Sequence, residues 1–411
     1  MLCAREADAR RHRLLRRAQS LLMDRRRLST IFVLGTAQTL AWGSTYYLPA
    51  VLADEMGRDI GITTDLFFGT FSAALIISAM IGPKVGRMID RTGGNGVLSA
   101  SSLLFAAALV LLSQAHSFLP FAAAWTLLGI GMGLGLYDAA FGALGRLYGK
   151  DARGAITGIT LLAGFASTVA WPLTAWGAAA IGWRETCLLW AAAHVVIGLP
   201  CNSLLLPRPT DLAATLKAVD EPVPFDRTMV LLAIAFSGAW IVSSGMAAHF
   251  PRIMEAAGAT PTQAIAAGAL IGPAQVAARM LEAGPLRRLH PLTSGRLATT
   301  THPVGSAILL TLGGGVAASV FAVLHGMGNG VITIARGTVP LALYGPKSYG
   351  YRLGLLGAPS RFLSAGAPFA FALLIDRLGA GVLIISSALC LTAFAALWMI
   401  PVPQPTASHA D

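Results

Sequence analysis

The sequence predicts an all-α, polytopic membrane protein with about twelve transmembrane helices in two parallel-repeat six-helix bundles. Hydrophobic residues make up 55% of the chain and charged residues only 12%, with a mean hydropathy of +0.67. Soluble domains carry roughly 25% charged residues. Apolar runs repeatedly reach the ~20 residues that a helix needs to cross the hydrocarbon core. Short motifs of the first half also recur in the second half.

Run length favours helices, because barrel strands need only about ten alternating residues and these runs do not alternate. The least apolar span is 297–314, which His302, Pro303 and several threonines dilute. The expected spans are 29–52, 64–83, 96–114, 118–141, 155–177, 185–205, 228–250, 262–281, 297–314, 317–341, 353–375 and 380–400.

These spans divide the chain into five parts. A charged, proline-rich segment at the middle is the expected cytoplasmic linker between the bundles, and it separates bundles at 29–205 and 228–401. The basic tail at 1–28 is either solvated or an amphipathic segment on anionic headgroups, and translation starts at Met1 or at Met23. The parts are thus 1–28, 29–205, 206–227, 228–401 and 402–411.

The net charge of +11 is explained by orientation in the membrane. Under this topology most of the 30 lysines and arginines fall on one side, and positively charged loops stay in the cytoplasm. We therefore expect a multi-pass protein of the inner (plasma) membrane with both termini cytoplasmic. Membrane lipid is the expected partner, no nucleic acid is needed, and the protein is expected to be a monomer.

Catalytic and metal-binding chemistry is not indicated. The four cysteines, Cys3, Cys187, Cys201 and Cys390, show no pairing or metal-ligand spacing. No nucleophile–base pair or phosphate-binding loop in its required context appears. We expect no metal, no cofactor and no enzyme activity.

Duplication is the best explanation of the repeated motifs. Four of five residues agree between two runs that are 195 positions apart (326 − 131), Gly131-Met132-Gly133-Leu134-Gly135 and Gly326-Met327-Gly328-Asn329-Gly330. Residues 278–282 likewise repeat the core of residues 86–90. Parallel halves related by an axis along the membrane normal are typical of secondary transporters.

Residues 82–94, between the second and third spans, form a basic, glycine-rich segment with one carboxylate, and we expect a turn here. Its core reads Gly86-Arg87-Met88-Ile89-Asp90-Arg91-Thr92-Gly93. This core resembles the signature of the major facilitator superfamily, and the resemblance covers roughly residues 29–401. It implies a secondary transporter that works by alternating access. The basic pair that the signature expects next is replaced by Gly94-Asn95.

The resemblance also implies a gate. Asp90 would dock on the inner end of the eleventh helix while the arginines lock the two halves, so the expected gating residues here are Gly86, Arg87, Asp90 and Arg91. An ordinary positive-inside loop would explain the basic residues but leaves the carboxylate of Asp90 without a reason.

Charges inside spans need a reason, because each costs ~2.5–3.5 kcal/mol on insertion scales. Asp138 is the only carboxylate well inside a span, and the repeat offset places Arg336 opposite it. The partner of Asp138 is either Arg336, across the halves near the inner gate, or Arg87 or Arg91 in its own half.

Two further arginines lie in spans. Arg279 has Glu282 at i+3, which predicts an intrahelical pair. Arg361 has no near acidic neighbour and is a candidate ligand for an anionic or carbonyl-bearing substrate; snorkelling to the inner water layer is the alternative.

Aromatic side chains suggest the rest of the substrate site, because stacking surfaces with a polar handle suit a flat or amphipathic ligand. An interfacial belt accounts for Tyr47, Trp125 and Trp176. The deeper aromatics are the expected substrate-binding residues: Trp42, Tyr46, Tyr137, Trp171 and Trp240. A proton coupled to transport would be carried by His325 or Asp138, although single buried histidines are mostly hydrogen-bonded core residues.

The function expected first is uptake of a small, mostly neutral amphipathic or aromatic solute, vitamin-like, with riboflavin as an example. The alternatives are a carrier of a small anion, either a monocarboxylate or an oxyanion, and efflux of a metalloid or drug. A non-transporting receptor or regulator is the alternative from another class.

Overall fold

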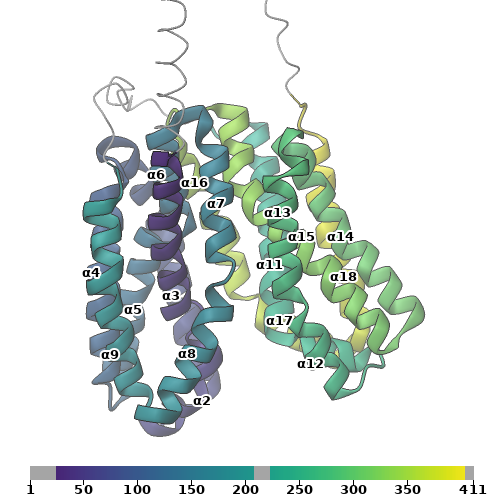
Figure 1. Cartoon of the computed structure of the whole chain (residues 1–411). Coiled ribbons are helices and arrows are strands. Elements are labelled where there is room, and N and C mark those ends of the chain that lie inside the picture. The colour runs from purple at the N-terminus through teal and green to yellow at the C-terminus, as the bar shows by residue number, and fades with distance from the viewer. Residues whose placement is uncertain (1–24, 208–222, 403–411) are drawn as a thin grey trace, which may run out of the picture.

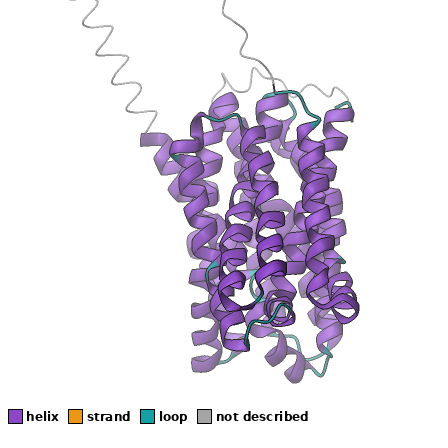
Figure 2. Cartoon of the chain, turned by 90° about the vertical axis from the view of Figure 1, so that its right-hand side faces the viewer, coloured by secondary structure: helices purple, strands orange, loops and turns teal. Residues whose placement is uncertain are grey.

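The computed structural model describes residues 25–207 and 223–402. Those residues form helices joined by short loops, and the described part contains no strand (Figure 2). The prediction of an all-α fold is therefore confirmed. Most of the predicted tails and of the predicted linker lie outside the described residues. Residues 25–28, which were expected to belong to the basic tail, already form part of a helix.

The first half consists of a helix at 25–44 followed by a series of helices that pack around one core. These are α2 (Pro49–Ile60), α3 (Thr64–Thr92), α4 (Gly94–Ser113), α5 (Phe118–Gly135), α6 (Tyr137–Tyr148), η1 (Gly149–Ala152), α7 (Arg153–Ala163), α8 (Ala166–Ile181), α9 (Trp183–Ala193) and the π-helical segments η2 (His194–Gly198) and η3 (Cys201–Leu205).

The second half has a similar series around two apolar clusters. Its elements are α11 (Arg227–Ala256), α12 (Pro261–Ala269), α13 (Ile271–Ala283), η4 (Pro285–Arg288), α14 (Pro291–Leu312), α15 (Gly314–Tyr344), α16 (Tyr349–Ala365), α17 (Ala367–Leu378), η5 (Gly379–Gly381) and α18 (Val382–Trp398).

Side-chain caps fix where several helices begin. The Thr63 hydroxyl accepts a hydrogen bond from the backbone N–H of Leu66, and Asp226 does the same for Met229. Such caps satisfy backbone donors that the first turn of a helix leaves unpaired. The helices thus start where the sequence supplies a capping oxygen before an apolar run.

Several predicted spans are two helices in line. The predicted span 118–141 breaks at Leu136, whose extended backbone separates α5 from α6. The predicted span 353–375 likewise breaks at Gly366, between α16 and α17. Eight stretches of the described chain are long and apolar enough to cross a membrane, and several contain more than one of these helices. The helices are consistent with the predicted arrangement of twelve.

The expectation of a turn over residues 82–94 was wrong. Helix α3 continues through Arg91 to Thr92, and only Gly93, with φ 83°, separates it from α4. A left-handed φ favours glycine, so the chain reverses at this one residue. The basic segment is therefore the last turns of a helix, and its side chains have fixed directions.

The two halves lie side by side, and the start of the first described helix and the end of α18 lie at the same end of the molecule (Figure 1). Helix α3 crosses closely over α16, where a Cβ at Gly86 would lie 2.1 Å from the carbonyl oxygen of Gly350. A Cβ at Gly354 would lie 2.5 Å from that of Gly82. Glycine is required on both sides of this contact.

One aromatic expected at a membrane interface lies elsewhere. Trp125 is fully buried against Phe67, Phe71 and Phe121. Trp176, by contrast, is 65% exposed. Only the second placement suits an interfacial residue, because its ring is free to meet lipid headgroups.

Candidate functional site

The most unusual charged cluster joins the two halves. Asp138 lies in the first turn of α6, directly after the break at Leu136. Its Oδ2 accepts hydrogen bonds from Nη2 of Arg336 on α15, at 2.7 Å, and from Nη2 of Arg361 on α16, at 2.5 Å. The side chains of the three residues are 8%, 6% and 14% exposed. We call these three residues the interhalf triad.

The structure therefore selects among the partners considered for Asp138. It brings the carboxylate to Arg336, and it adds Arg361, which was expected to have no acidic neighbour and to await a ligand. Arg361 does have an acidic neighbour, which comes from the other half of the chain. Its role as a substrate ligand stays a prediction. The guanidinium of Arg87 lies instead over the ring of Tyr351, at 4.1 Å.

The interhalf triad holds two cations and one anion, so it carries an excess positive charge in a buried place. Asp138 Oδ1 and Arg336 Nε are also buried without a hydrogen-bond partner in the described part of the chain. Buried charges are stable only when they are paired and hydrogen-bonded. One further anion would complete this cluster.

A glycine makes room for the interhalf triad. A Cβ at Gly357 of α16 would lie 2.5 Å from Asp138 Oδ2 and 2.8 Å from Arg336 Nη2. Both distances are shorter than any normal contact of a carbon atom. The ion pair and the close passage of α16 therefore depend on the missing side chain at this position.

The carboxylate of Asp90, near the end of α3, caps a helix of the other half. Asp90 accepts hydrogen bonds from the backbone N–H groups of Gly350 at 2.9 Å and Tyr351 at 2.8 Å. These groups lie in the first turn of α16, where N–H groups lack intrahelical partners and the helix dipole is positive. Arg91 lies exposed on the last turn of α3.

A second contact joins the halves at residues 278–282, which repeat residues 86–90 in the second half. Glu282 of α13 is buried and accepts a hydrogen bond from Arg153 of α7 at 2.8 Å, and Arg153 also donates to the carbonyl of Leu289. Arg279 donates to the carbonyl of Thr160 in α7 at 2.9 Å. The predicted intrahelical pair of Arg279 and Glu282 is wrong, because both side chains reach the other half. We call this contact the α7–α13 latch.

The expected substrate-binding aromatics fall into different surroundings. Trp42, Tyr46 and Tyr137 form a cluster in which the ring centroids of Trp42 and Tyr137 are 4.9 Å apart. Trp42 and Tyr137 are buried, and the Nε1 of Trp42 has no partner among the described residues. Trp171 is 45% exposed and donates to the carbonyl of Tyr47. The ring of Trp171 also lies edge-on to that of Tyr47, at 5.9 Å, so Trp171 joins the aromatic cluster only through Tyr47.

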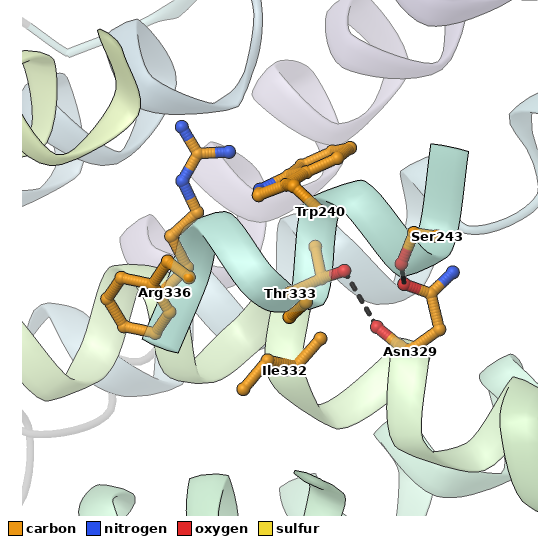
Figure 3. Close-up of a pocket in the computed structure, with 8 residues that line it drawn as sticks. Trp240, Ser243, Asn329, Ile332, Thr333 and Arg336 are labelled. Carbon is orange, nitrogen blue, oxygen red and sulfur yellow. Dashed lines mark hydrogen bonds between the residues drawn. The ribbon is translucent and has the colours of Figure 1, made fainter. Parts of the chain in front are cut away.

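Trp240 belongs to a small pocket between α11 and α15 (Figure 3). The guanidinium of Arg336 lies 5.2 Å from the ring centroid of Trp240, and the ring also packs against the core of the first half. The pocket therefore combines an aromatic face with one cation of the interhalf triad. Its labelled lining residues are Trp240, Ser243, Asn329, Ile332, Thr333 and Arg336. Ser243, Asn329 and Thr333 were not singled out from the sequence.

His325 has a second histidine beside it. The Nδ1 atoms of His302 and His325 are 3.0 Å apart, and Nε2 of His302 is 2.9 Å from the hydroxyl of Ser386. A hydrogen bond between two Nδ1 atoms needs one protonated and one unprotonated nitrogen, so at least one ring is neutral. Among the described residues no group of three or more potential metal ligands occurs.

The family model described as Major Facilitator Superfamily matches residues 31–320. No curated protein matches the sequence. Among solved structures, the human organic anion transporter MFSD10 (TETRAN) superposes with a TM-score of 0.68 at 17% identity, covering 91% of this chain and 99% of that one.

A second solved structure gives the same result for the fold. The proton:xylose symporter XylE, bound to 6-bromo-6-deoxy-D-glucose, superposes with a TM-score of 0.69 at 11% identity. The alignment covers 92% of this chain and 96% of that one. At such low identity these likenesses show a shared fold.

Proposed function

Because this chain belongs to the major facilitator superfamily and is a multi-pass membrane transporter, we propose that it carries a small organic anion by alternating access. The observation that carries the proposal is the interhalf triad, in which Arg336 and Arg361 share the single carboxylate of Asp138. A substrate carboxylate would supply the second anion that the interhalf triad lacks. Guanidinium groups suit this role because they bind carboxylates in planar, two-bonded geometry.

The proposed gate follows from contacts on one side of the molecule. The capping of α16 by Asp90 and the α7–α13 latch both join the halves near the helix ends that adjoin the predicted cytoplasmic loops. Arg87 over Tyr351 adds to the same contact, and Gly86 permits the close approach. Opening toward the cytoplasm would require these contacts and the interhalf triad to separate.

Substrate binding would couple to that separation through competition. A carboxylate that binds Arg336 or Arg361 weakens the hold of the guanidinium groups on Asp138, since each donor then has two acceptors. A ligand shifts a conformational equilibrium only by its differential affinity for the two states. Release of Asp138 supplies such a difference, because the halves are joined through it.

The apolar part of the substrate would rest on Trp240. Its ring lies under the guanidinium of Arg336 and lines the pocket, so an aromatic or conjugated carboxylate would contact both. The proposed substrate is therefore flat, as the sequence led us to expect, but it also carries a negative charge. Nothing in the comparisons points to riboflavin.

A neutral aromatic solute is the second candidate, and the cluster of Trp42, Tyr46 and Tyr137 favours it. The two candidates differ in their response to mutation. An anion carrier should lose affinity in Arg361→Gln, whereas a carrier of neutral aromatics should suffer more from Trp42→Ala. The name of MFSD10 as an organic anion transporter agrees with the first candidate, but an identity of 17% supports only the fold.

We also propose that proton coupling, if the flux responds to pH, runs through His325 and its partner His302. A proton added to the neutral pair would turn its acceptor nitrogen into a donor and break the bond between the rings. Asp138 is the weaker proton carrier, because its protonation would leave two buried guanidinium groups without a counter-ion.

The coupling proposal has a matched control in the first half. His194 is buried and bonded to Ser44 at 2.7 Å, as His302 is to Ser386, but it lacks a second imidazole. Uptake measured at two external pH values should lose its pH response in His302→Gln and keep it in His194→Gln. An unchanged pH response in His302→Gln would exclude the pair as the proton carrier.

We keep the inner membrane and the cytoplasmic termini that the positive-inside distribution predicts, and we further propose that the protein is a monomer and that uptake is the direction of transport. The experiment is uptake into proteoliposomes of labelled aromatic carboxylates, each beside its uncharged carboxamide. Wild-type protein should carry the acids preferentially, and Arg361→Gln should abolish the preference. Arg252→Gln, which removes an exposed arginine, is the control. Absence of any flux would favour a non-transporting receptor, and equal flux of acids and amides would refute an anion carrier.

A further inference from the structure

Besides Arg336, the pocket between α11 and α15 is lined by the side-chain amide of Asn329, which the sequence did not single out. Asn329 and Ser243 lie at one end of the pocket and Arg336 at the other, with Trp240 between them (Figure 3). Asn329 and Arg336 are both on α15 and are seven residues apart. At a rise of 1.5 Å per residue this separation is about 10 Å along the helix axis.

The hydrogen bonds of Asn329 leave its amide nitrogen available. The Ser243 hydroxyl donates to Asn329 Oδ1 at 2.8 Å, which uses the acceptor of the side chain. The Thr333 hydroxyl donates to the backbone carbonyl of Asn329 at 2.8 Å. Neither bond uses Nδ2, and this atom has no partner in the part of the chain that the structure describes. Two N–H donors therefore remain on Asn329.

The packing of α15 fixes the side of the helix on which this amide lies. A Cβ at Gly326 would lie 2.7 Å from the carbonyl oxygen of Ile271, and one at Gly330 would lie 2.6 Å from that of Gln275. These glycines press α15 against α13 and hold its rotation. Asn329 is thereby kept next to α11, where Ser243 fixes the direction of the amide.

We infer that Asn329 is a specificity-determining residue that donates a hydrogen bond to an acceptor group of the substrate at the end remote from its carboxylate. The inference rests on the proposed anion carriage. It names a narrower class of substrate: an organic anion with a flat apolar middle and a carbonyl, ether or second carboxylate oxygen about two helical turns from the first carboxylate. An analogue without that oxygen leaves a desolvated donor unpaired, and sites of this kind reject such analogues strongly.

Two acids that differ only in the remote acceptor provide the test. Biphenyl-4-carboxylate and 4′-acetylbiphenyl-4-carboxylate have the required length, and only the second carries the acceptor oxygen. Their affinities are measured by titration of the purified full-length protein in lipid nanodiscs. We expect wild-type protein to bind the acetyl acid at least about tenfold more tightly.

The variants separate specificity from folding. Asn329→Leu should abolish the preference, measured as the ratio of the affinities for the two acids. Ser243→Ala should reduce the preference, because the amide is then free to rotate. Ser244→Ala is the matched control: Ser244 also bonds across helices, to the carbonyl of Ser364, but does not line the pocket. It should keep the full preference. Thermal unfolding of each variant shows whether it is folded.

The outcomes distinguish the two proposals. Equal affinity of wild-type protein for the two acids, with binding that depends on Arg336, overturns the role of Asn329 and leaves the anion carrier standing. A preference that survives in a folded Asn329→Leu protein also overturns it. Failure of both acids to bind overturns the anion carrier and this inference together.

Discussion

The carboxylate of Asp138 and the guanidinium of Arg336 meet at 2.7 Å across the boundary between the two halves of the chain. Arg361 shares the same carboxylate oxygen. One buried anion thus holds two cations of the opposite half. This contact links the electrostatics of the pocket to the separation of the halves that alternating access requires.

Replacing Asp138 alone should destabilise the protein more than replacing Asp138 and Arg336 together. Asp138→Asn leaves two guanidinium groups without a counter-ion, and breaking a buried ion pair in this way costs about 3–5 kcal/mol. The double variant Asp138→Asn with Arg336→Gln should be more stable than Asp138→Asn alone. Thermal unfolding in detergent is measured for the wild type, for each of the two single variants and for the double variant. Asp54→Asn, at an exposed position, should behave as wild type, and strictly additive losses would argue against the coupling.

Gly357 should tolerate no side chain. The added Cβ in Gly357→Ala would meet Asp138 Oδ2 and Arg336 Nη2 at less than 3 Å, so the triad must move. We expect flux to fall at least about tenfold, as it does for other displacements of binding groups. Gly272→Ala, where a Cβ meets nothing within 4 Å, is the matched control. Wild-type flux in Gly357→Ala would mean that the geometry of the triad is not needed for transport.

The α7–α13 latch should hold the inner side closed. Glu282→Gln removes the charge that Arg153 pairs with, and we expect the population open toward the cytoplasm to rise. Spin labels at exposed positions 150 and 288 would report a longer distance between the halves. Glu255→Gln, a change at an exposed residue of α11, should leave the distance distribution unaltered. An unchanged distribution in Glu282→Gln would remove the latch from the gate.

The contacts of Asp59, at the other side of the molecule, predict how the stability of the protein depends on pH. Hydrogen bonds from Arg184 and from the indole of Trp183 hold the pKa of the Asp59 carboxyl below its usual range. The stabilisation is therefore complete above the pKa of the unfolded state, about 3.9, and is lost as the pH falls through the lower folded pKa. The wild-type melting temperature should fall more steeply below about pH 4 than that of Asp59→Asn. Parallel curves would show that this contact adds nothing.

The sequence carried enough information for the fold but only part of the site. Apolar run length alone predicts the helices, because the bilayer imposes it on any spanning segment. The repeat offset brought Asp138 near Arg336, since equivalent helices of a duplicated protein occupy equivalent places. Both arguments concern positions along the chain.

What the sequence could not supply was the rotation of each helix about its axis. Arg361 lacks an acidic neighbour in sequence, yet it meets Asp138 from 223 residues away. The i+3 spacing of Arg279 and Glu282 suggested a pair, but both side chains reach α7. Ser243 and Asn329 are unremarkable residues until α11 and α15 are placed together.

The most direct test of the account is the affinity of Asp138→Asn for an aromatic carboxylate. If the substrate competes with Asp138 for the two guanidinium groups, removal of that competitor should tighten the binding of biphenyl-4-carboxylate by roughly tenfold, while flux through proteoliposomes falls. Titration of the variant beside the wild type in nanodiscs gives the affinity. Binding that is weaker than wild type, unchanged or absent would contradict the claim that Asp138 and the transported anion share Arg336 and Arg361.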